Sequence, residues 1–135
     1  MNVHVFRLLP NQDVKKELKN FVQINNIKAG VILSVVGSLS AINLRTAGGK
    51  DCLNISDAFE ILSMTGTLSE SGNHVHLAIS DRTGKTLGGH LMDGCIVRTT
   101  AEIAIMTLKN LSFERELDDR TGYDELVVNT NDSGL

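Results

Sequence analysis

Three histidines in the middle of the chain have the residue type and the spacing of a metal site. His74 and His76 are separated by one residue, so in a β-strand their side chains lie on the same face. The segment Asp81-Arg82-Thr83-Gly84 has the composition of a type I turn whose glycine closes a three-residue hairpin loop. This turn sets the register of the flanking strands and places His90 opposite His76. The sequence therefore predicts a β-hairpin that brings the three imidazoles together.

The chemistry of this cluster would be that of a zinc site with an open position. Opposite residues of a hairpin have Cβ atoms roughly 5 Å apart, so three ring nitrogens can reach one ion at about 2.0–2.1 Å. Catalytic zinc keeps an open position, whereas structural zinc is usually closed by four protein ligands. No acidic fourth ligand stands near these histidines in the sequence. The alternative is that they are ordinary strand histidines, bonded to neighbours or water.

The opposite face of the predicted hairpin is apolar and is expected to pack on the core. Its residues are Val75, Leu77, Ile79, Leu87 and Leu91. The histidine face carries Ala78, Gly88 and Met92, which are small or flexible residues that leave room for a ligand.

Three further residues are candidates for roles in such a site. Arg45 or Arg98 could pair with an anionic substrate, and Glu102 could move a proton. The alternative is that all three are surface or turn residues.

Composition narrows the classes of protein that fit. The chain has 135 residues, of which 41% are apolar and 21% charged, as expected for one globular domain. Its net charge of −3 disfavours direct nucleic-acid binding, which normally requires a basic surface. The sequence predicts no membrane segment and a cytoplasmic location, with Cys52 and Cys95 acting as small buried residues.

Hydrophobic periodicity predicts one helix and several strands. The helix begins after Asn11 or Asp13 and ends before Gly30. The strands are expected at residues 3–9, 31–36, 41–46, 58–68, 101–108, 113–117 and 123–128, together with the two strands of the hairpin that spans residues 73–92. We expect one domain over residues 1–128 and a disordered tail over 129–135.

Several ordered blocks of sequence resemble the PPC domain, the "plants and prokaryotes conserved" family, between about residues 6 and 126. These blocks are residues 27–39, 59–68, 74–76, 88–91, 99–103 and 121–126. Because the chain has no AT-hook, it is similar to the stand-alone prokaryotic type. The resemblance implies an α/β (α+β) fold with a mixed, antiparallel-rich sheet, and assembly into a homotrimer. It also implies distant kinship in fold with acetolactate decarboxylase, which holds zinc on three histidines, and so supports zinc at His74, His76 and His90.

The resemblance also suggests an interface. In plant members, a segment that corresponds to residues 57–62 takes part in association with transcription factors. The candidate interface residues here are Phe59, Glu60, Ile61 and Leu62. The alternative is that the apolar residues of this segment fill the domain core.

Two functions remain open from sequence. The first is a trimeric regulatory or protein-interaction module associated with DNA-bound complexes, and on this reading the chain is not an enzyme. The second is a zinc-dependent small-molecule enzyme or sensor of the acetolactate decarboxylase type.

Overall fold

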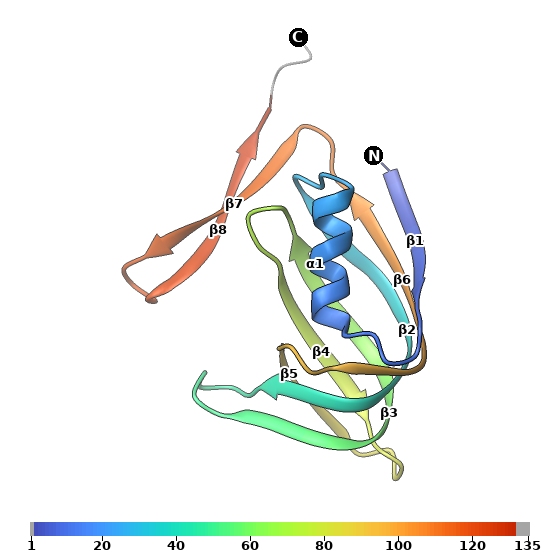
Figure 1. The fold of residues 1–135 in the computed structure, drawn as a ribbon. Helices are drawn as coiled ribbons and strands as arrows, with labels where there is room; N and C mark the ends of the chain where they lie inside the picture. Colours follow the sequence, from blue (N-terminus) through green and yellow to red (C-terminus); the bar gives the residue numbers. More distant parts are fainter. Residues whose placement is uncertain (1, 132–135) are drawn as a thin grey trace.

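One helix lies across a six-stranded sheet, and a separate two-stranded hairpin projects to the side (Figure 1). The computed structural model describes residues 2–131, and residues 1 and 132–135 lie outside the described part. The elements in chain order are β1 (Asn2–Leu8), α1 (Val14–Ile24), β2 (Gly30–Arg45), β3 (Cys52–Leu68), β4 (His74–Ser80), β5 (Thr86–Leu91), β6 (Ile96–Thr107), β7 (Leu111–Asp118) and β8 (Tyr123–Thr130).

The main sheet has the strand order β1-β6-β2-β3-β4-β5, and every neighbouring pair is antiparallel. The end of β2 also pairs with β5, where Arg45 lies opposite His90. This contact closes β2, β3, β4 and β5 into a ring. The predicted α+β class, with one main helix and an antiparallel-rich sheet, is confirmed, but the expectation of a mixed sheet is wrong for residues 2–131, because all the paired strands are antiparallel.

Local residues determine where the helix begins and ends. Asp13 caps its N-terminus, with the side chain accepting a hydrogen bond from the Lys16 backbone N–H at 3.1 Å. The helix ends at Ile24, and Asn26 follows with a φ of 50° in the left-handed region. Gly30, which was expected to end the helix, is instead the first residue of β2. The helix is therefore shorter than the spacing of its apolar residues suggested.

The core lies between α1 and the sheet. The helix contributes Val14, Leu18 and Val22, each at most 1% exposed. The apolar face of the β4–β5 hairpin is buried as predicted, except that Leu87 is only partly buried. Each fully buried aliphatic side chain stabilises the fold by about 1.5–3 kcal/mol.

Several strands are longer than predicted. β2 continues through Gly37–Ser40 with register irregularities, where the sequence suggested a break. β3 begins at Cys52 rather than Ala58, because residues 52–56 pair with the end of β2. β6 likewise begins at Ile96 rather than Ala101. Pairing with neighbouring strands has overridden the weak local β propensity of these polar segments.

The C-terminal strand and the cysteines require corrections. β8 continues through Thr130, so Asn129 and Thr130 belong to a paired strand rather than to the expected tail. Asn131 follows the strand and donates its backbone N–H to the Asn110 carbonyl oxygen at 2.8 Å, and the last residues of the predicted tail, 132–135, lie outside the described part. Cys95 is buried as expected, but Cys52 is exposed.

The candidate interface segment divides between core and surface. Phe59 and Ile61 are 4% and 6% exposed and belong to the core of the chain, which is the alternative considered for them. Glu60 is exposed and Leu62 is 52% exposed. Any interface role for the segment therefore falls on these last two residues.

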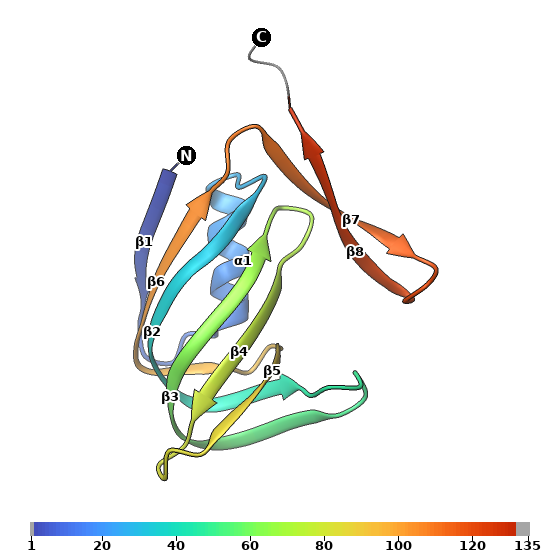
Figure 2. The same cartoon turned by 180° about the vertical axis from the view of Figure 1, so that it is seen from behind.

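Figure 2 shows the face of the sheet that lies away from α1. Several strands carry exposed apolar side chains on this face. On β1, the rings of His4 and Phe6 contact Phe21 of the helix, so the alternating residues point the other way. The exposed residues on this outer face are Val3, Val5, Val36 and Leu62. Among residues 2–131, no helix is long and apolar enough to cross a membrane.

Candidate metal centre

The β4–β5 hairpin has the predicted turn and register. Gly84 has a φ of 85° and donates its N–H to the Asp81 carbonyl oxygen at 3.0 Å. The Asp81 side chain accepts hydrogen bonds from the N–H groups of Thr83 and Lys85, which fixes the loop. His76 pairs directly with His90, as the turn chemistry required.

The three imidazoles converge on one point. One nitrogen from each ring lies within 4.8 Å of the others. The Nε2 atoms of His74 and His76 are 3.2 Å apart. Two nitrogens bound to one tetrahedral zinc would lie about 3.3 Å apart, given bonds of 2.0–2.1 Å. If one of these two nitrogens carries a proton, the contact is a hydrogen bond. If neither does, both nitrogens are free to bind the same metal ion.

His90 contains a buried polar atom without a partner. Its Nδ1 atom is shielded from solvent and makes no hydrogen bond to any residue of the described chain. An unpaired buried nitrogen costs free energy that a bound ligand could recover. The donor set therefore fits a metal ion.

The electrostatics keep the rings in the form that binds metal. Burial, followed by the charge of Arg45, lowers the pKa of His90 to about 4. Burial and the neighbouring His76 also lower the pKa of His74. Both rings are therefore neutral near pH 7, as a metal ligand must be.

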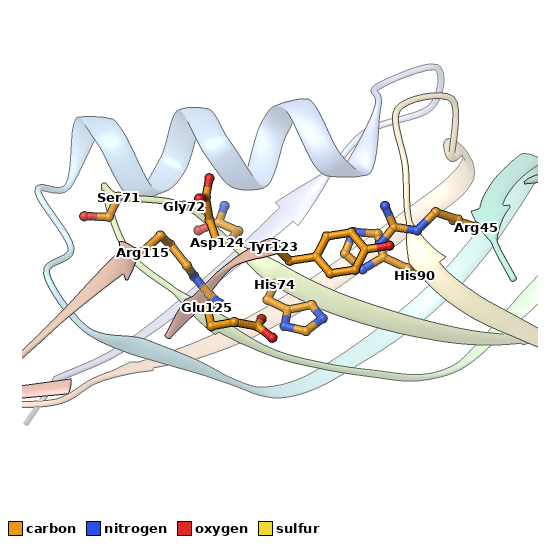
Figure 3. A pocket seen from close by; sticks show the side chains of 10 residues that line it. Arg45, Ser71, Gly72, His74, His90, Arg115, Tyr123, Asp124 and Glu125 are labelled. Atoms are coloured by element: carbon orange, nitrogen blue, oxygen red, sulfur yellow. The ribbon is translucent and has the colours of Figure 1, made fainter. Parts of the chain in front are cut away.

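Two pockets open beside the histidines. The first has a volume of about 500 Å³ and the second about 560 Å³, and both include Arg45, His74, His90 and Tyr123. Figure 3 shows the first pocket, which also includes Ser71, Gly72, Asn73, Arg115, Asp124 and Glu125. These volumes suit small molecules.

The structure separates the three other predicted site residues. Arg45 lies in both pockets, and its guanidinium carbon is 5.8 Å from the centre of the Tyr123 ring. Arg98 and Glu102 are exposed on β6 and line neither pocket. The Glu102 side chain instead accepts a hydrogen bond from the Thr100 hydroxyl, and its backbone lies opposite that of Arg7 in the β1–β6 ladder.

Residues of the β7–β8 hairpin also lie at the site, and the sequence did not predict them there. Arg115, Tyr123, Asp124 and Glu125 line the first pocket. The sequence around these residues contains no spacing that is typical of a catalytic or metal-binding motif. The one signal for Tyr123, Asp124 and Glu125 is that residues 121–126 resemble a conserved block of the family, and Arg115 has no such signal. Their presence in the pocket depends on the position of the β7–β8 hairpin relative to the main sheet.

Together, the fold and the site define a small α+β protein with a three-histidine cluster on a β-hairpin. The chain belongs to the family of the Plants and Prokaryotes Conserved (PCC) domain, written PPC above, which matches residues 1–109. The bifunctional protein GlmU of Synechococcus sp. (strain JA-3-3Ab) is 44% identical over 128 residues, or 95% of this chain and 21% of that protein. The chain thus spans about a fifth of the length of the curated relatives it matches.

Solved structures share this fold. A hypothetical protein from Salmonella enterica has a TM-score of 0.92 at 43% identity, over 96% of this chain and 94% of that one. A metal-containing protein from Archaeoglobus fulgidus has a TM-score of 0.82 at 21% identity, over 94% of each chain. A candidate DNA-binding protein from Bacteroides thetaiotaomicron has a TM-score of 0.84 at 21% identity, over 93% of this chain and 91% of that one.

The expected distant relation in fold is also confirmed. A Staphylococcus aureus protein described as similar to alpha-acetolactate decarboxylase has a TM-score of 0.54 at 13% identity. The match covers 78% of this chain and 52% of that one.

Proposed function

We propose that this chain is a metal-dependent small-molecule-binding protein that holds a divalent ion, best fitted by zinc, on His74, His76 and His90. The observation that carries the proposal is the convergence of three imidazole nitrogens within 4.8 Å beside two pockets. The unpartnered His90 Nδ1 supports it. A structural neighbour from Archaeoglobus fulgidus is described as metal-containing, which agrees with this assignment.

The residues around the centre suit an anionic ligand. When bound, the ion would polarise a carbonyl or carboxylate oxygen of that ligand as a Lewis acid. Arg45 would pair with negative charge on the ligand, because its guanidinium has no ion pair within residues 2–131. Glu125 shares the first pocket with His74 and is therefore better placed than Glu102 to carry a proton.

Zinc retention and ligand binding test this proposal directly. Protein purified without a His tag should retain zinc, and the zinc-loaded protein should bind small carboxylates with an affinity that falls when Arg45 is replaced by Gln. Turnover in a screen of hydroxy-keto acids would identify an enzyme. Saturable binding without turnover would identify a sensor.

We also propose that the working form is a cytoplasmic homotrimer. The exposed apolar side chains on the outer face of the sheet, with Val36 and Leu62 at 60% and 52% exposed, support association between copies, although Arg7 and Glu102 lie on the same face. Interfaces of homo-oligomers are more apolar than ordinary surface. Light scattering should give three times the monomer mass.

The second candidate is a regulatory module that contacts other proteins at DNA-bound complexes. The observation that favours it is the Bacteroides thetaiotaomicron neighbour described as a candidate DNA-binding protein. The net charge of −3 argues against direct contact with DNA. A gel-shift titration at low salt, with and without co-purified proteins, tests this role, and the absence of any shifted duplex would contradict it.

A further inference from the structure

We propose that the ligand of the first pocket is a small dicarboxylate, held by Arg45 at one end and by Arg115 at the other. This inference rests on the proposed metal centre and adds the chemical class of its ligand. Two cationic side chains on different elements carry the argument, together with the charge balance of the pocket.

Arg115 reaches the pocket from β7 and is fixed at the His74 end. Its Nη2 atom donates a hydrogen bond to the Thr67 hydroxyl at 2.9 Å, and Thr67 pairs with His74 in the β3–β4 ladder. A guanidinium has five N–H donors, and this hydrogen bond uses one of them. Within residues 2–131, Arg115 makes no ion pair, although Asp124 and Glu125 line the same pocket.

Arg45 reaches the pocket from β2 and lies at the His90 end. Its backbone is opposite that of His90, and its guanidinium lies over the Tyr123 ring. Like Arg115, it makes no ion pair with the described part of the chain, and unlike Arg115 its side chain makes no hydrogen bond there either. Figure 3 shows Arg45 and Arg115 at opposite ends of the pocket, with Tyr123 between them.

The charges of the pocket favour two negative groups on the ligand. Two arginines and a divalent ion carry four positive charges, whereas Asp124 and Glu125 carry two negative charges. Two positive charges remain, so a dianion would neutralise the site. A dianion that bridges both arginines would therefore be attracted more strongly than a monoanion of the same size.

The separation of the arginines selects a dicarboxylate over a single phosphate. A guanidinium matches a carboxylate through two parallel hydrogen bonds. A phosphate concentrates its charge at one point, whereas the two arginines lie at opposite ends of the pocket. A diacid places one carboxylate at each end and an aliphatic chain against the Tyr123 ring.

The test compares diacids with monoacids of equal length on the zinc-loaded protein. Malonate, succinate, glutarate and adipate are titrated by calorimetry against propionate, butyrate, valerate and hexanoate. We expect one diacid to bind at least about tenfold more tightly than its matched monoacid. In Arg115→Gln, this ratio should fall below about threefold, while zinc content is retained.

Arg120→Gln is the matched control, because Arg120 lies on the same hairpin but pairs with Asp118 outside both pockets. The Arg120→Gln variant should keep the preference for diacids. The Arg115→Lys variant should keep part of this preference, because lysine retains the positive charge but cannot donate two parallel hydrogen bonds to a carboxylate. A zinc-loaded protein that shows no diacid preference would overturn the inference, as would a preference that survives in Arg115→Gln. A protein that takes up no zinc would contradict the proposed function itself, and elemental analysis before titration separates the two outcomes.

Discussion

Replacing Gly89 by Ala should weaken metal binding without removing any ligand. An added Cβ at this position would lie 2.6 Å from the Arg45 carbonyl oxygen and 3.2 Å from the Leu44 Cβ atom. Ordinary contact begins near 3.4 Å, so β5 must move away from β2 by about 0.8 Å. The next residue is His90, and metal–nitrogen distances tolerate only about 0.2 Å of change.

The expected result is a loss of zinc affinity of about tenfold or more, which is the scale seen when the support of a ligand is disturbed. The free energy of unfolding should also fall by ~1–3 kcal/mol, the usual cost of overpacking. Zinc affinity is measured by competition with a chromophoric chelator, and stability by urea denaturation of the metal-free protein.

Gly88→Ala provides the matched control. Its Cβ would lie 3.0 Å from the Leu77 carbonyl oxygen, which a shift of a few tenths of an ångström relieves. Zinc affinity should therefore fall less than in Gly89→Ala. Wild-type zinc affinity in Gly89→Ala would refute the argument that contact between β2 and β5 positions His90.

Three other predictions concern pH, the helix and assembly. Because burial lowers the pKa of His90 to about 4, the unfolded chain takes up a proton between pH 6.5 and 4 that the folded metal-free protein does not. Its stability should therefore fall as pH decreases through this window, and urea midpoints for His90→Asn should fall less steeply. Asp13→Ala removes the helix cap and an acceptor for the Gly94 N–H, and denaturant unfolding should show a loss of at least ~1 kcal/mol. Leu62→Glu places a charge on the proposed trimer contact, so light scattering at micromolar concentration should show dissociation, and an unchanged mass would place the contact elsewhere.

The hairpin could be predicted because its signals are local. The turn at residues 81–84 and the two-residue alternation on both sides determine which side chains face each other. The observed pairing of His76 with His90 follows from these signals alone. The buried side of the helix was predictable for the same reason, and so was its capped N-terminus, although Asn11 and Asp13 could not be told apart as the cap.

The rest of the site depends on contacts between distant segments. The pairing of β2 with β5 brings Arg45 to His90, and no sequence pattern specifies it. The β7–β8 turn at residues 118–122 was predictable, but the placement of this hairpin beside the histidines was not. Arg115 and Glu125 were therefore not selected as candidates, whereas Arg98 and Glu102, which are close in sequence to the β4–β5 hairpin, lie elsewhere on β6.

The most direct test of the metal centre is the zinc content of the protein prepared without a His tag. Elemental analysis should find stoichiometric zinc in the wild-type protein and little in His76→Ala. His4→Ala should retain the metal, because His4 packs against Phe21 outside the cluster. Wild-type protein that lacks metal after zinc supplementation, or His76→Ala protein that retains it in full, would contradict a metal centre at these histidines.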